Sequence, residues 1–174
     1  MVSGCGSPTE KIAWLCTKVL SSLLDHVPSH LRDIHNHLER LNQLSPEELR
    51  GKNFCSADVT SLYTNINIQG CINDVISQAS EHKDSLNMFG LELLDVYEML
   101  KLVLTSSYFV FDQKLYQQLL GLFMGCKPSP IGAIVRVYTF ERRSVYVEPT
   151  TSQLCRSTVD KWTMLELSLS QKNN

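Results

Sequence analysis

The chain has 174 residues, of which 43% are hydrophobic and 20% are charged, and its net charge is -2. This balance is typical of a globular domain and excludes both a disordered chain of low hydrophobicity and a collagen-like repeat. The weak net charge argues against a strongly basic module that binds nucleic acid or a membrane surface. No apolar run reaches the roughly 20 residues that span a bilayer, and the N-terminus lacks the pattern of a signal peptide. We therefore expect an intracellular protein, nuclear or cytoplasmic, that does not contact a membrane.

Cysteine and histidine residues offer little sign of a metal site. The six cysteines are scattered along the chain without a C-x-x-C pair, so we expect reduced thiols that fill the core. Four histidines fall within residues 26–37. His26 and His30 would share one face of a helix, but Pro28 lies between them and breaks that helix. A solvated surface is the favoured interpretation, because a catalytic zinc needs a third ligand.

Apolar periodicity predicts two helices in the N-terminal part of the chain. The first covers residues 10–26, with Thr9 or Ser7 as its cap, and the second starts at Pro28. A polar turn and a loop are expected at residues 44–52. A short strand then covers residues 53–59 and ends in a turn that leads into the next helix.

The pattern of the remaining residues predicts helices, one hairpin and a tail. Helices are expected at 69–81, at 91–105 and from 131 to about 145, and strands at 108–111 and 115–117 form a hairpin. Beyond Pro149 the apolar residues keep no common face, so we expect a disordered tail at 149–174 after a domain at 1–148.

One carboxylate and one glycine-rich loop stand out as candidates for chemistry. Asp58 follows a predicted strand, where a carboxylate beside free backbone carbonyls suits a hard cation such as Mg²⁺. Gly121 and Gly125, close to Met124, would let the backbone approach a ligand closely. From the residues alone a plain turn and a plain connection remain open, because one carboxylate is too few for a two-metal site.

Two blocks of sequence resemble the reverse transcriptase of Penelope-like retroelements. The first is S-A-D-V-T-S-L-Y-T-N-I at residues 56–66, and the second is F-V-F-D-Q-K-L-Y-Q-Q-L-L-G-L-F-M-G-C-K-P-S-P-I-G-A at residues 109–133. Upstream, V-S-G-C-G-S-P-T-E-K-I-A resembles the segment that follows the family's fingers hairpin, so the likeness covers about residues 2–148. The resemblance implies an α+β fold, a partial polymerase palm and fingers in which short antiparallel strands pack on several helices.

The resemblance also implies a site for RNA-directed DNA synthesis, in which aspartates from two motifs hold two metal ions against a template-primer and a dNTP. Asp58 matches the catalytic, metal-binding aspartate of the first motif, and Val59 would offer its carbonyl to the same Mg²⁺. Tyr63 matches the aromatic residue beneath the sugar of the nucleotide. The residues that match the nucleotide and template side of the second block are Gln118, Gly121, Met124 and Gly125. Such a site positions a triphosphate by metal ions and backbone groups.

The sequence departs from the family pattern at the second catalytic motif. An aromatic-x-Asp-Asp hairpin is expected within a few tens of residues after Tyr146, but the chain contains no Asp-Asp pair, and Asp160 stands alone. The fingers motif would lie upstream of Met1 and is expected to be missing, as are the thumb and the endonuclease. We therefore expect an inactive fragment with weak or no binding to nucleic acid.

Two alternatives to a decayed fragment remain open. A polymerase part could be completed in trans by a chain that supplies the Asp-Asp hairpin, although this would leave a sheet edge between two chains. A non-enzymatic module could bind nucleic acid, although the basic residues form no obvious stripe. On the favoured hypothesis a frameshift between about Tyr146 and Arg156 removed the second motif. Without that hairpin the helices around Ile72 and Leu100 would keep uncovered apolar faces, which predicts marginal stability.

Overall fold

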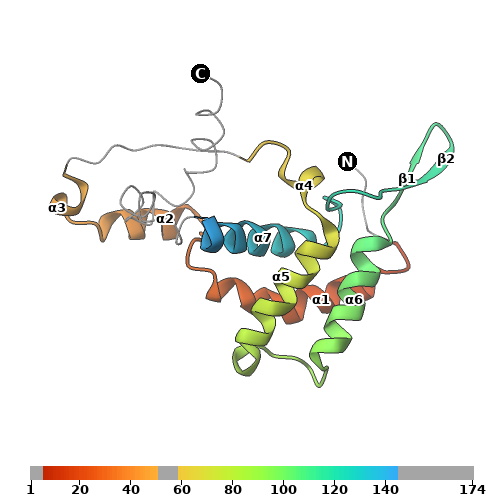
Figure 1. The fold of residues 1–174 in the computed structure, drawn as a ribbon, viewed down its shortest axis with the longest axis horizontal. Coiled ribbons are helices and arrows are strands. Elements are labelled where there is room, and N and C mark those ends of the chain that lie inside the picture. Colours follow the sequence, from red (N-terminus) through yellow and green to blue (C-terminus); the bar gives the residue numbers. More distant parts are fainter. Residues whose placement is uncertain (1–5, 51–58, 145–174) are drawn as a thin grey trace. The chain divides into compact units, whose positions relative to one another are not determined.

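The computed structural model describes residues 6–50 and 59–144 (Figure 1). These belong to two compact units. The first unit comprises Met1–Pro28 and Ser61–Thr139, and the second comprises Ser29–Thr60 and Phe140–Asn174.

Two predicted segments fall outside these ranges. The strand expected at 53–59 lies outside the described residues except for Val59, which belongs to no helix or strand, and the tail at 149–174 lies outside them entirely. In the part that is described, no helix combines the length and the apolar character needed to cross a membrane.

The first predicted helix is confirmed in its extent, but it changes its winding partway. It forms the α-helix α1, Glu10–Leu20, followed by the 3₁₀ helix η1, Ser21–His26. At this junction the Ser21 hydroxyl donates to the carbonyl of Thr17. Such hydroxyls compete with the backbone pattern of an α-helix, which is a physical reason for the tighter turn.

The expected side-chain cap of α1 is wrong. Thr9 stands at the N-cap position, but its side chain makes no capping hydrogen bond. Its hydroxyl lies 3.3 Å from that of Ser7 instead. The Glu10 carboxylate accepts from the Gly6 amide at 2.7 Å, so the first helical residue ties down the preceding chain.

The start predicted at Pro28 for the second helix is also wrong. The helix α2, Ile34–Asn42, begins after Asp33, whose carboxylate accepts from the Asn36 amide at 2.8 Å. An aspartate N-cap stabilises a helix start by its side-chain hydrogen bond, whereas a proline is only compatible with the first helical turn. The single turn α3, Pro46–Leu49, follows within the segment where a capped turn was expected.

The central helices agree with the sequence pattern. The short helix α4, Leu62–Asn65, leads into α5, Ile68–Glu81, which is capped by Asn67. A 3₁₀ turn, η2, covers Lys83–Ser85. The helix α6, Leu93–Thr105, begins two residues later than predicted.

The start of α6 is fixed by a reciprocal cap. The Glu92 amide donates to the Asp95 carboxylate at 2.8 Å, and the Glu92 side chain accepts from the backbone of Asp95. This capping box satisfies amides that the first helical turn leaves without partners.

The predicted hairpin is confirmed. Strand β1, Tyr108–Phe111, pairs antiparallel with β2, Lys114–Gln117, and their turn is formed by Asp112 and Gln113. Both turn residues have positive φ, 49° and 59°, as a tight two-residue hairpin turn requires. The described elements therefore form an α+β protein. The expectation that the strands pack on helices is wrong, since nearly all residues of both strands are exposed.

The last described helix, α7, covers Ser129–Ser144 and confirms the helix predicted from residue 131. It begins two residues early, with Pro130 in its first turn, where a proline costs no hydrogen bond. The boundary between the two units falls inside α7 after Thr139, so only the part up to that residue belongs to the first unit.

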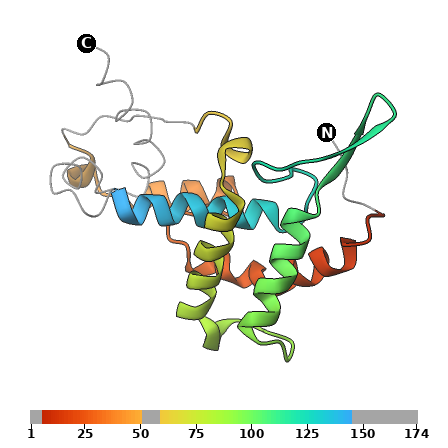
Figure 2. The same ribbon diagram turned by 45° about the vertical axis from the view of Figure 1, so that its right-hand side comes forward.

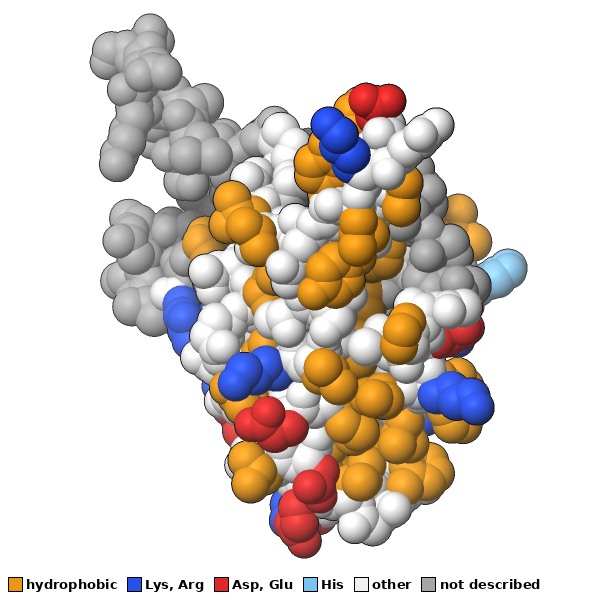
Figure 3. Space-filling view, turned by 90° about the vertical axis from the view of Figure 1, so that its right-hand side faces the viewer, with side chains coloured by type: hydrophobic (Ala, Val, Ile, Leu, Met, Phe, Trp, Pro, Cys, Tyr) orange, Lys and Arg blue, Asp and Glu red, His pale blue; other side chains and the backbone are white. Residues whose placement is uncertain are grey.

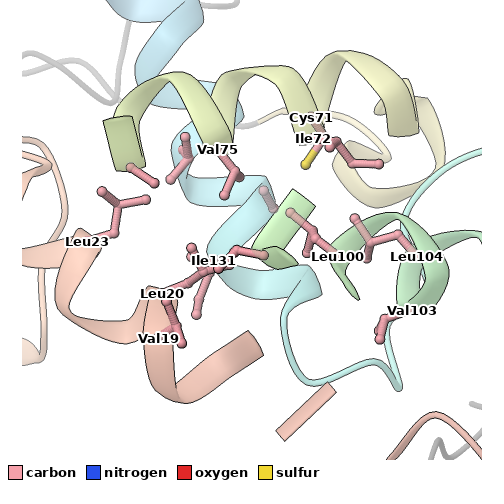
Figure 4. Packing of buried hydrophobic residues seen from close by; sticks show 14 of the residues in the cluster. Val19, Leu20, Leu23, Cys71, Ile72, Val75, Leu100, Val103, Leu104 and Ile131 are labelled. Carbon is pink, nitrogen blue, oxygen red and sulfur yellow. The ribbon is translucent and has the colours of Figure 1, made fainter. Parts of the chain in front are cut away.

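The core of the first unit lies among its helices. Helices α5 and α6 lie side by side, and α1 packs against α6 (Figures 1 and 2). Figure 4 shows apolar side chains of α1, α5, α6 and α7 meeting between these helices. The expectation that apolar faces around Ile72 and Leu100 stay uncovered is wrong, because these two residues are only 0% and 1% exposed.

Candidate functional site

The two blocks of sequence that carried the resemblance meet at one backbone contact. The amide of Leu122 donates to the carbonyl of Tyr63 at 2.7 Å. Gly121 has φ +76°, and a Cβ placed on it would lie 2.6 Å from both the Tyr63 oxygen and the Thr64 Cα. Only glycine allows both this backbone conformation and this close approach.

The first block prepares its side of the contact by a local turn. Ser61 stands before α4 with φ 53°, and its carbonyl accepts from the hydroxyl of Thr64 at 2.9 Å. The side chain of Tyr63 is half-buried and is packed against the core cluster of the unit. The turn therefore directs the Tyr63 carbonyl toward the second block, while the ring contributes to the core.

Gln118 holds the second block in place. Its backbone N–H donates to the Ser107 carbonyl at 2.8 Å, at the base of the hairpin. Its side-chain Nε2 donates to the carbonyls of Leu120 and Gly121 at 2.9 Å and 3.3 Å. The side chain of Gln118 thus stabilises the loop that presents Gly121 to the first block.

A cavity of about 400 Å³ lies next to this loop. Its apolar walls come from the start of α1, the end of α6, β1 and the loop before α7, including Ala13, Val103, Tyr108 and Phe123. Gly125 also lines it. The volume is in the range of pockets that take small molecules.

An ion pair lies in the wall of this cavity. Lys127 Nζ lies 3.3 Å from Glu10 Oε1, so the loop before α7 is joined to the first turn of α1. The hydrogen bond from the Gly6 amide, followed by that from Lys127, lowers the pKa of Glu10. The carboxylate is in contact with solvent, so this ion pair contributes little to the free energy of unfolding. Its structural effect is to hold the loop next to α1.

The predicted site residues are only partly brought together. Tyr63, Gln118 and Gly121 form one connected group, whereas Met124 is 57% exposed. Gly125 lines the cavity, and Tyr63 and Gln118 do not.

The predicted metal pair is not tested by the structure. Asp58 lies outside the described residues, and Val59, which is half-buried, belongs to the second unit. Within residues 6–50 and 59–144, no group of three or more His, Cys, Asp or Glu residues is arranged to hold a metal ion.

The histidine cluster takes part in a local contact between segments. The ring of His26 stacks on that of His82, with centroids 4.1 Å apart, and its Nε2 lies 2.9 Å from the Ser85 hydroxyl. The carbonyl of His30 accepts from Arg40 at 3.0 Å within the second unit. Through these contacts His26, the last residue of η1, packs against the segment that contains η2. The spacing of His26 from His30 did not indicate this.

Three cysteines confirm the expectation of free thiols in the core. Cys16, Cys71 and Cys126 are buried and unpaired. Burial raises the pKa of Cys16 to about 11, and burial together with the neighbouring Asp74 carboxylate raises that of Cys71 to about 12. Burial also raises the pKa of Cys126. These thiols are poor nucleophiles in the folded protein.

Sequence reasoning missed an ion pair with a buried carboxylate inside the first unit. Asp74 on α5 is buried and pairs with Arg136 on α7, and the guanidinium also lies close to Gly70. A charged residue on the otherwise apolar face of the predicted helix at 69–81 was the available signal, because buried carboxylates need a partner. The pair joins α7 to the middle of α5.

No protein-family model, curated protein or solved structure matches this chain. Any functional assignment therefore rests on the sequence blocks themselves and on the contacts between them.

Proposed function

We propose that this chain is part of the polymerase domain of a reverse transcriptase of the Penelope-like type, and that the polypeptide does not synthesise DNA by itself. The first block carries the aspartate and the aromatic residue of such a site, Asp58 and Tyr63. The second block carries the glycines that would lie beside a nucleotide and its template, Gly121 and Gly125.

The observation that carries this proposal is the contact between Gly121–Leu122 and Tyr63–Thr64. Two segments far apart in the sequence, each similar to a polymerase motif, join through a hydrogen bond of 2.7 Å. The glycine is required at that point by a positive φ and by the backbone opposite it. Motifs that contribute to one nucleotide site must lie close together. The contact supports the proposal because it joins the two motifs.

The lack of catalysis follows from the chemistry of two-metal sites. Two cations a few ångströms apart need carboxylates on both sides, so that the attacking and leaving oxygens are both stabilised. Asp58 with the Val59 carbonyl would supply one side. The sequence has no Asp-Asp pair for the other side, so we expect no productive pair of Mg²⁺ ions.

Primer extension tests the proposal. The purified chain is incubated with RNA or DNA template-primer, dNTPs and either Mg²⁺ or Mn²⁺, and no template-dependent incorporation is expected. Incorporation that is lost in Asp58→Ala and kept in Asp84→Ala would overturn the inactive assignment. It would favour a polymerase completed by another chain.

Nucleic-acid binding separates the proposal from a repurposed binding module. We expect weak or no association with a duplex at physiological salt, because the chain has 16 basic and 18 acidic side chains. Tight binding that falls steeply with salt, measured by fluorescence anisotropy, would show phosphate contacts by several lysines or arginines. That result would favour the module.

A further inference from the structure

The β1–β2 hairpin carries apolar side chains on both of its faces. Phe109 stacks on Tyr116 on one face, with ring centroids 5.5 Å apart, and Val110 lies opposite Leu115 on the other. Val110 is 68% exposed and Leu115 is 70% exposed. A hairpin of this length is barely stable in water without a covering surface.

The surface around the hairpin is large and, apart from Asp112 and Lys114 at the turn, uncharged. Its exposed apolar residues are Tyr108, Val110, Phe111, Leu115, Tyr116, Leu119, Leu120 and Met124. Since one aromatic side chain can bury about 150–250 Å², this set exposes several hundred Å². That is of the order of the roughly 800 Å² per partner that a standard interface buries. Figure 3 shows apolar side chains gathered on the side of the molecule where the hairpin lies.

The charges near this surface indicate what kind of partner fits it. From residue 106 to residue 126 only Asp112 and Lys114 are charged, and both are in or next to the turn. The next cation, Lys127, lines the cavity with Tyr108 and is paired with Glu10, so phosphate groups of a nucleic acid or a lipid find few available cations there. An uncharged surface of this kind fits another protein surface that is equally uncharged.

The two edges of the hairpin differ in how they are protected. Strand β2 begins with Lys114, and a charged residue on an edge discourages further pairing. Strand β1 reads Y-F-V-F, without charge, proline or glycine. In the described part of the chain the sheet has two strands and no third covers β1, so its outward amides and carbonyls offer a template for another strand.

We propose that β1 is the edge along which two copies of this chain pair antiparallel, so that their hairpins form one continuous sheet across a dimer. An antiparallel pair of identical strands is self-complementary about a two-fold axis. Centred on Val110, it sets Val110 of one copy opposite Val110 of the other, and Phe109 opposite Phe111. Aromatic and β-branched residues are the pairs that stabilise neighbouring strands. The proposal does not depend on the proposed function.

Sedimentation velocity over a range of concentrations of the full chain tests this proposal. We expect a reversible monomer–dimer equilibrium, and Val110→Lys should raise the dissociation constant at least about tenfold, because two lysines then face each other across the pair. Leu94→Lys is the matched control. Leu94 on α6 is 69% exposed, so it accepts lysine at the same cost to the fold and should leave the dimer unchanged.

Hydrogen exchange identifies the paired edge. The amides of Tyr108–Phe111 should exchange more slowly as the concentration rises, and this protection should vanish in Val110→Lys, whose circular dichroism should match the parent. A monomer at every concentration, a dimer that survives Val110→Lys, or equal dissociation in Leu94→Lys would each overturn the proposal. So would a dimer without added protection of β1.

Discussion

Gly121 is the residue on which the contact between the two sequence blocks depends. In Gly121→Ala, a methyl group would meet the backbone of Tyr63 and Thr64 at 2.6 Å, in addition to the strain of a positive φ. We expect a loss of about 2–5 kcal/mol in the free energy of unfolding, the sum of left-handed strain and overpacking. Urea unfolding followed by circular dichroism measures it.

Gly90→Ala is the matched control for that substitution. Gly90 has φ +80°, close to the +76° of Gly121, but a Cβ there meets nothing within 4 Å. It should cost only the strain, about 1–2 kcal/mol. Equal losses in both variants would show that the approach to Tyr63 and Thr64 contributes nothing.

The pair Gly132 and Cys71 allows a second test at the scale of single residues. A Cβ on Gly132 would lie 2.7 Å from Cys71 Sγ, where α7 packs on α5. Gly132→Ala alone should destabilise the protein by about 1 kcal/mol or more, because a buried thiol has little room to move. In a Cys71→Ala background the same change should stabilise it by about 0.5–1 kcal/mol, the helix preference of alanine over glycine. A double-mutant cycle by urea unfolding measures this reversal, and the same loss in both backgrounds would contradict it.

The buried thiols predict a loss of stability at high pH. The unfolded thiols ionise near the ordinary pKa of 9.0, whereas the folded pKa values of Cys16 and Cys71 are about 11 and about 12. The unfolded state therefore loses protons first. The stabilisation is complete below pH 9 and falls as the pH rises toward the folded values, by at most about 1.4 kcal/mol per pH unit for each thiol.

Urea unfolding across this alkaline range measures the effect. Cys71→Ala should have a shallower dependence of unfolding free energy on pH than the parent protein, because one titrating group is removed. Lysine and tyrosine ionisation affects both proteins alike, so the difference isolates the thiol. An unchanged slope would contradict the assignment of a raised pKa to Cys71.

At the scale of elements, the helices could be predicted wherever an apolar period and a strong cap agreed. The helix expected at 69–81 became α5 within one residue, because Asn67 caps it. The start predicted at Pro28 failed because Asp33 further along provides a better cap. Local hydrogen bonds of this kind decide helix ends, and periodicity alone does not specify them.

The candidate site shows where sequence reasoning stops. A glycine in a Gly-Pro-rich loop indicated the unusual backbone of Gly121, but its partner Tyr63 is a long-range contact that spacing cannot reveal. The hairpin is the opposite case. Its strands were recognised from their composition, but Y-F-V-F is typical of a buried strand. Its exposure on both faces does not follow from the sequence, and the proposed dimer would cover its free edge.

At the scale of the whole chain, the proposed reverse transcriptase origin leaves the absence of an Asp-Asp pair to be explained, and the codons of the tail allow one explanation. If the reading frame is shifted by two bases, Trp162 followed by Thr163 forces the codon GAC, which encodes Asp. Thr163 followed by Met164 gives a codon ending in AT, which can be GAT, a second Asp. Lys161 followed by Trp162 allows GTG, a Val directly before them.

The neighbouring codons extend this agreement. Residues 156–160 permit Phe-Tyr-Gly-Arg, and residues 164–169 permit Ala-Gly-Thr-Val-Ala, so the shifted frame can read F-Y-G-R-x-V-D-D-A-G-T-V-A. Asp160 and Lys161 allow only Gln or a stop at x, where reverse transcriptases of the proposed type have an aromatic residue. Trp162 and Thr163 fix the first Asp codon, whereas the other codons of this run are permitted by the degeneracy of the code.

A frameshift between about Tyr146 and Arg156 would therefore account for three features together: the likeness that ends near residue 148, the absence of an Asp-Asp pair, and a tail without hydrophobic periodicity. We expect the nucleotide sequence of the gene to encode Val-Asp-Asp in the shifted frame across the codons of Lys161–Met164. Sequencing the locus checks this directly. Any other residues at those three positions would contradict the frameshift, whereas the contact between Gly121 and Tyr63 would stand unaffected.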